Sequence, residues 1–149
     1  MGEHDHSRLQ ALLANYFVAM EKRFPIRVFT EQRVRVVADR DRIRYRIPDV
    51  CVMLRPYRKE RVLTEAPLIA IEILSPDDTM MSMMARLEDF RSLGIRHIWV
   101  VDPARRKVYE LQSDLETASM SEVNGAVLTV TQFGVSVDFN QIFRELDQD

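Results

Sequence analysis

A short apolar run bounded by prolines, PLIAIEILSP at residues 67–76, constrains the fold more than any other part of the sequence. Apolar residues occupy both alternating sides of this run, which is typical of a central strand buried on both faces of a sheet. A helix is predicted next, from about Thr79 to Leu93 with Gly94 at its end, followed by the strand RHIWVVDP. This succession predicts an α/β sandwich around a mixed sheet.

The remaining elements extend this pattern in both directions. Residues 7–22 have the apolar spacing of a helix, and IRVFTEQRVRVV and RIRYRIPDVCVM are predicted as two strands of a hairpin joined by the polar ADRD. KVYELQ, strands around a tight turn at Asn124–Gly125 and a short helix at residues 140–146 follow. The predicted fold is an α-β-β-β-α-β core with a mixed central sheet flanked by helices, plus a β-rich C-terminal extension.

Alternation within these elements predicts which side chains face the interior. In RIRYRIP, the apolar side chains are predicted to lie on the dry side of the strand and the arginines on the wet side, and the dry set is Ile43, Tyr45 and Ile47. In the helix after Thr79, the predicted buried stripe comprises Met80, Met83, Met84, Leu87 and Phe90.

The composition is that of an ordinary globular protein, with 46% hydrophobic and 30% charged residues. At 149 residues we expect a single domain over residues 1–149. No apolar run approaches the roughly 18 residues of a membrane helix, so no membrane association is expected. The single cysteine, Cys51, excludes an intramolecular disulfide and suits the cytoplasm. Because the net charge is −2, any binding of nucleic acid must use a local basic patch.

Two carboxylates stand where a globular protein rarely places them. Asp49 follows Pro48 and precedes the apolar VCVM, and Glu72 sits inside the apolar run 23 positions later. A buried charge without a partner costs several kcal/mol, so such groups are usually paired, protonated or bound to a metal. If the two strands are neighbours, the carboxylates can converge on a divalent cation such as Mg²⁺. Alternatively, each bonds a buried arginine or a backbone N–H.

Four segments in a fixed order carry a resemblance to a known family. RIPDV, IEILSP, LEDFRSLGI and HIWVVDP together resemble a large bacterial family of restriction endonucleases, a branch of the PD-(D/E)xK nuclease superfamily. The resemblance extends over nearly the whole chain, from VFTEQRVRV to FGVSVDFNQIF. It implies a restriction-endonuclease-like fold.

The resemblance also implies roles for individual residues. Asp49 matches the aspartate of the PD element, and Glu72 matches the acidic residue of the second element. The superfamily's lysine two positions later is replaced by Leu74, as is usual in this family, whose members instead carry a basic residue on the following helix. Arg86 occupies that place. Glu31, in FTEQ, matches a family glutamate and is a candidate third acidic group.

The implied chemistry is hydrolysis of phosphodiester bonds in DNA by a homodimer. Asp49, Glu72 and the Ile73 carbonyl would hold Mg²⁺ or Mn²⁺. Arg86 would act as an electrostatic clamp, because an arginine cannot give up its proton at physiological pH. An alternative role for Arg86 is a surface ion pair with Asp89, three positions on. The alternative function is a catalytically degenerate member of this fold that binds nucleic acid or a protein.

Two further segments carry clusters of charged or histidine side chains. RPYRKER, at residues 55–61, has the composition of a loop that could track a phosphate backbone, although a solvated charged loop is the more common explanation of such a segment. EHDH near the start carries His4 and His6 without further metal ligands nearby in the sequence, and we interpret it as a terminal tail.

Overall fold

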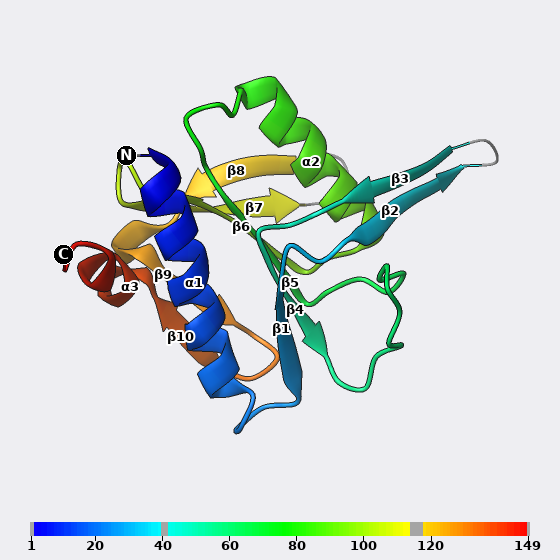
Figure 1. The fold of residues 1–149 in the computed structure, drawn as a ribbon, viewed down its shortest axis with the longest axis horizontal. Coiled ribbons are helices and arrows are strands. Elements are labelled where there is room, and N and C mark those ends of the chain that lie inside the picture. Colours follow the sequence, from blue (N-terminus) through cyan, green and yellow to red (C-terminus); the bar gives the residue numbers. More distant parts are fainter. Residues whose placement is uncertain (1, 40–41, 114–117, 149) are drawn as a thin grey trace.

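A six-stranded mixed sheet forms the centre of the protein, which we describe from a computed structural model covering residues 2–39, 42–113 and 118–148 (Figure 1). Among the described strands of this sheet, only β5 and β6 pair in parallel. All five residues of β5 are buried, which confirms the predicted central strand. In spatial order the strands are β1 (Ile26–Thr30), β4 (Val50–Leu54), β5 (Ile69–Ile73), β6 (His97–Asp102), β7 (Lys107–Ser113) and β8 (Ala118–Glu122).

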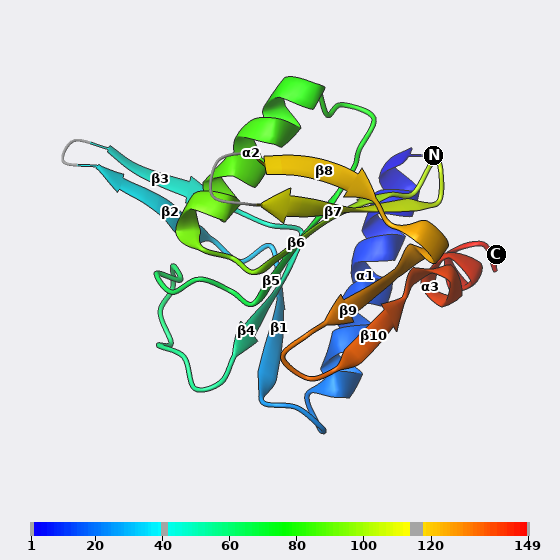
Figure 2. The ribbon, with the colours of Figure 1, turned by 180° about the vertical axis from the view of Figure 1, so that it is seen from behind.

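Helices cover both faces of this sheet, as predicted. Helices α1 (Gly2–Met20) and α3 (Phe139–Leu146) pack on one face, together with the hairpin of β9 (Val127–Val130) and β10 (Val135–Asp138). Helix α2 (Met80–Leu93) packs on the other face (Figure 2). Each face of the sheet has its own hydrophobic core, and alternate residues of β4 and β5 point into one or the other. Side chains at even positions of β4 pack with α1, and those at odd positions pack with α2. The predicted turn at Asn124–Gly125 forms the 3-10 segment η1 (Asn124–Ala126).

Helix α2 begins and ends where the sequence predicts. The side chain of Thr79 accepts a hydrogen bond from the N–H of Ser82 in a capping box, and Gly94 ends the helix with φ of +93°. The predicted stripe is wrong at its edges, because Met80 is 76% exposed and Met84 is 36% exposed. Only the line of Met83, Leu87 and Phe90 reaches the sheet, since the first turn extends beyond the strands (Figure 1).

The two long strands predicted between residues 26 and 53 are each divided in two. The halves farthest from the predicted hairpin turn are β1 and β4, which pair within the central sheet. The halves nearest the turn, β2 (Val34–Asp39) and β3 (Arg42–Arg46), form a separate hairpin. This hairpin, which we call the arm, projects away from the body in both views (Figures 1 and 2). Its tip, residues 40–41 of the predicted ADRD turn, lies outside the described residues. The chain changes direction at Glu31, whose φ is +54°, and at Pro48.

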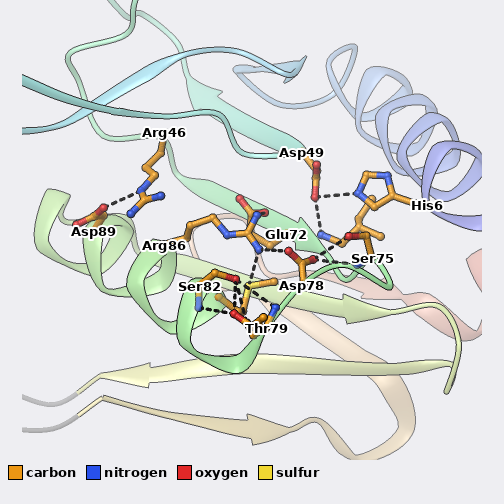
Figure 3. A network of polar contacts seen from close by, with 12 residues as sticks. His6, Arg46, Asp49, Glu72, Ser75, Asp78, Thr79, Ser82, Arg86 and Asp89 are labelled. Atoms are coloured by element: carbon orange, nitrogen blue, oxygen red, sulfur yellow. Dashed lines mark hydrogen bonds and ion pairs between the residues drawn. The ribbon is translucent and has the colours of Figure 1, made fainter. Parts of the chain in front are cut away.

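The arm reverses the predicted sides of β3. The apolar side chains face solvent: Ile43 is 54% exposed, Tyr45 is 45% exposed and Ile47 is 51% exposed. Arginines on the opposite side bond the buried carboxylate of Asp89 on α2. Arg46 Nε lies 2.7 Å from it (Figure 3), and Arg44 Nη1 lies 3.3 Å from it. The prediction of two different faces is confirmed, but the prediction that the apolar side chains face the interior is wrong. The arginines face the protein instead, because the buried carboxylate of Asp89 on α2 pairs with them.

The N-terminal helix also differs from the prediction. It begins at Gly2, so EHDH forms its first turns, and the interpretation of this segment as a tail is wrong. Among the described residues, no helix is long and apolar enough to cross a membrane.

Candidate active site

Glu72 lies on β5 and Asp49 directly precedes β4, and the predicted adjacency of these two strands is confirmed. Strands β4 and β5 are antiparallel, with Val50 opposite Ile71. The same register, extended by one position, sets Asp49 against Glu72 at the point where the chain leaves the arm and enters the sheet. Glu72, two positions from Ala70 on β5, therefore belongs to the α2 side of the sheet.

Asp49 is held by contacts from α1, which precedes it in the chain, and from β5, which follows it. Its Oδ2 accepts a hydrogen bond from the N–H of Ile73 at 2.7 Å, and His6 Nε2 on α1 lies 3.4 Å from the same oxygen. Its carbonyl accepts a hydrogen bond from Gln10 Nε2 at 2.8 Å. Partial burial raises the pKa of Asp49, although the Ile73 N–H, His6 and Arg86 all oppose that rise.

Glu72 is the most deeply buried charged residue of the site, with 1% of its surface exposed. Its Oε2 lies 3.3 Å from Arg86 Nη1, whereas its Oε1 is buried and has no hydrogen-bond partner among the described residues. Burial, and then repulsion from Asp49, raises the pKa of Glu72 to about 8. The guanidinium of Arg86 lowers it, but by less than burial raises it.

Arg86 reaches over the sheet from α2, as the resemblance implies (Figure 3). Its guanidinium lies between two carboxylates, since Nη2 also bonds Asp78 Oδ1 at 2.7 Å. The N–H of Ser75 in turn donates to Asp78 Oδ2 at 2.9 Å. The alternative ion pair of Arg86 with Asp89 is wrong, because Asp89 is bonded by the arginines of the arm.

Glu31 does not join this group through its side chain. Its backbone N–H lies 3.4 Å from the carbonyl of Asp49, but its side chain is exposed and points along the base of the arm. There it lines a hollow of about 500 Å³, whose other lining residues are Gln32, Arg33, Ile47, Arg61 and Val62. The Glu31 backbone therefore contacts Asp49, but no hydrogen bond or ion pair joins the Glu31 carboxylate to the side chain of Asp49 or Glu72 within the part of the chain that is described.

No hydrogen bond or ion pair joins a side chain of the basic loop or Cys51 to Asp49 or Glu72 among the described residues. Cys51 is fully buried in β4, and burial raises the pKa of its thiol to about 12, which leaves it unreactive. Arg58 and Glu60 of the loop lie 3.5 Å apart, and the ring of Tyr57 packs edge-on against Phe29.

The donor set of the site fits a hard cation. Asp49 and Glu72 supply carboxylate oxygens, and Oε1 of Glu72 is a buried acceptor without a hydrogen-bond partner among the described residues. Among the described residues, no group of three His, Cys, Asp or Glu side chains is close enough to hold a metal ion. The acidic pair would therefore share a cation with backbone, water or substrate oxygens.

Sequence reasoning missed two residues that contact this site, His6 and Asp78. His6 precedes the buried Leu9 and Leu13 of α1 by three and seven positions, so it lies on the same face of the helix, and this spacing was available in the sequence. Asp78 directly precedes the capping residue Thr79 of α2. Its contact with Arg86 depends on how the chain bends after Pro76, which has no sequence pattern of its own.

A mixed sheet covered by helices, with an acidic pair where two central strands meet, defines a restriction-endonuclease-like α/β protein. Comparison with known families agrees: residues 1–140 match the Uma2 family, described as "Putative restriction endonuclease", and the chain belongs to that family. A solved structure described as a putative nuclease belonging to DUF820, from Anabaena variabilis, is similar in fold. It is 20% identical, with a TM-score of 0.76 over 95% of this chain and 82% of that one. No curated protein matches the sequence.

Proposed function

We propose that this protein is a metal-dependent endonuclease that hydrolyses phosphodiester bonds of DNA. The observation that carries the proposal is the acidic pair: Glu72 is 1% exposed, has one oxygen without a hydrogen-bond partner among the described residues, and has its pKa raised by burial and by the charge of Asp49. Two carboxylates that repel each other in a buried position destabilise the fold. A requirement to bind a cation gives this arrangement a purpose that folding alone does not.

The residues divide the work by their chemistry. Asp49, Glu72 and the carbonyl of Ile73 would hold Mg²⁺ or Mn²⁺, which supplies activation of water and neutralisation of phosphate charge. Arg86 keeps its charge at any accessible pH, so it orients the reacting phosphate and stabilises its negative charge without accepting a proton. His6 and the N–H of Ile73 fix the orientation of the Asp49 carboxylate.

A second candidate function is a catalytically degenerate relative that binds nucleic acid or a protein. One observation favours it: Arg86 stands where family members carry a basic residue, often lysine, and its guanidinium lies against both Glu72 and Asp78. In that case the arginine would serve as the permanent counter-charge of the pair, and no metal would be needed.

Plasmid cleavage separates the two functions. The wild type should nick supercoiled DNA with Mg²⁺ or Mn²⁺, while Asp49→Asn and Glu72→Gln should not. Glu145→Gln, an exposed carboxylate on α3, is the matched control and should cleave like the wild type. Glu31→Gln tests the third acidic group in the same assay. Calorimetry should show metal binding that Asp49→Asn weakens, and equal binding by that variant and the wild type contradicts the site.

We also propose that residues 1–149 form one domain that acts as a homodimer. A single cooperative unfolding transition and the sedimentation coefficient of the intact chain test these two points separately.

A further inference from the structure

Positive charge is concentrated around the arm. Residues 27–61 hold 11 of the 21 Lys and Arg residues but only 5 of the 23 Asp and Glu residues, a net charge of +6. The remaining residues therefore carry −8, since the whole chain has a net charge of −2. Such segregation creates a local positive field that the overall charge conceals.

The outward side of the arm combines free cations with exposed apolar groups. We call it the outer face, and its described residues are Arg33, Arg35, Ile43, Tyr45 and Ile47. Arg35 lies directly opposite Tyr45 in the hairpin register, and the guanidinium of Arg33 stacks 5.7 Å from the centre of the Tyr45 ring. Both arginines are therefore on the tyrosine side of the arm.

The arginines of the two sides of the arm differ in their partners. Those on the inner side, Arg44 and Arg46, are neutralised by Asp89. Arg33 and Arg35 form no ion pair with any side chain that the structure describes, as is also true of Arg61 at the edge of the adjoining hollow. The inner side is thus used to fix the arm, and the outer face is left with uncompensated charge.

The outer face leads directly to the acidic pair. Tyr45 precedes Asp49 by four residues, so the two are at most about 14 Å apart along the chain. That distance corresponds to about four base pairs of duplex DNA at roughly 3.4 Å each. The part of a nucleic acid that contacts Tyr45 would therefore lie within about that distance of Asp49.

We infer that the arm is the element that grips duplex DNA, with Arg33 and Arg35 on the phosphates and Tyr45, Ile43 and Ile47 against the groove. A two-stranded antiparallel ribbon has the width that a major groove admits, and an arm that stands clear of the body can enter one. The inference deepens the proposed function and rests on it for the identity of the substrate.

A second copy of the chain fits this face less well. In a two-fold symmetric dimer the same patch meets itself, so Arg33 and Arg35 would oppose their own counterparts. Like charges brought together in an interface repel each other, whereas a phosphate backbone neutralises both arginines. Charge complementarity therefore favours nucleic acid over self-association.

The test is the binding of a fluorescent 30-base-pair duplex, measured by anisotropy in EDTA so that no cleavage intervenes. The double variant Arg33→Glu/Arg35→Glu should weaken binding at least about tenfold and reduce the salt dependence, the slope of log K against log salt, by about 2. The control Arg23→Glu/Arg144→Glu makes the same change of charge beside α1 and on α3, and should bind like the wild type.

Tyr45→Ala provides an independent test of the same inference. It should weaken binding several-fold with an unchanged salt slope, because an aromatic contact releases no counterions. Unchanged melting temperatures would show that all variants fold. Equal affinity of the double arm variant and its control overturns the inference, as does a sedimentation result in which the arm variants only dissociate a dimer.

The inference and the proposed function fail separately. If the wild type nicks plasmid while the arm variants bind duplex normally, the proposed nuclease activity is supported and DNA binding by the arm is refuted. If the wild type binds duplex through the arm but cleaves nothing with Mg²⁺ or Mn²⁺, DNA binding by the arm is supported and the proposed nuclease activity is refuted.

Discussion

Replacing Glu72 with glutamine tests whether the buried carboxylate opposes folding. In the unfolded chain this group has a pKa near 4.5, and in the folded protein burial and Asp49 raise it to about 8. Between these two values the unfolded chain gives up the proton that the folded protein keeps, so rising pH favours unfolding. The stability associated with protonated Glu72 is complete below about pH 4.5 and is lost as the pH rises towards 8.

The size of the effect follows from the width of that window. Each pH unit contributes at most 1.36 kcal/mol, so the wild type should lose up to about 3 kcal/mol between pH 4.5 and pH 7 through this group. Glu72→Gln keeps the shape of the side chain and cannot ionise. It should therefore be as stable as the wild type near pH 4.5 and progressively more stable above it.

Urea denaturation in EDTA, followed through the fluorescence of the buried Trp99, measures this difference across the pH range. The difference between variant and wild type cancels the contributions of other groups, and Glu145→Gln should change stability by less than about 0.5 kcal/mol at every pH. A loss of several kcal/mol in Glu72→Gln at pH 7 would refute the reasoning. It would mean that an ionised Glu72 holds the fold together through Arg86.

Three further changes test neighbouring features. Arg86→Ala should slow plasmid cleavage roughly a hundredfold, whereas Arg86→Lys should retain part of the rate; initial nicking rates decide this. Asp89→Asn should cost about 1–3 kcal/mol in urea denaturation and make the arm easier to cleave with trypsin, because Arg44 and Arg46 lose their carboxylate. Gly94→Ala should lower stability by about 1 kcal/mol, because φ is +93° at the end of α2; its melting temperature, compared with that of the exposed Ser92→Ala, measures this.

The central strand and helix α2 were predictable because local chemistry determines them. An apolar run such as residues 68–74 has one stable position, inside a sheet, and Thr79 and Gly94 are both suited to the helix ends they occupy. The pairing of Asp49 with Glu72 followed from adjacency of the two strands, which the structure confirms.

The sides of β3 could not be predicted, because the deciding partner is 43 residues away. Alternation of arginine and apolar residues indicates two different faces, but not which of them has a neighbour. Asp89 supplies that neighbour on the arginine side. The contact of His6 with Asp49 was missed for a related reason: a residue near the start of the chain was judged from its immediate surroundings, while its partner comes from the sheet.

Helix α2 carries two contacts three residues apart that point to different parts of the molecule. Asp89 fastens the arm, and Arg86 lies against Glu72. One rigid helix thus connects the surface inferred to bind DNA with the acidic pair, so a movement of either contact is transmitted to the other through α2. A ligand that displaces the arm is expected to shift Arg86, and by thermodynamic reciprocity a ligand at the acidic pair then changes affinity at the arm by the same factor.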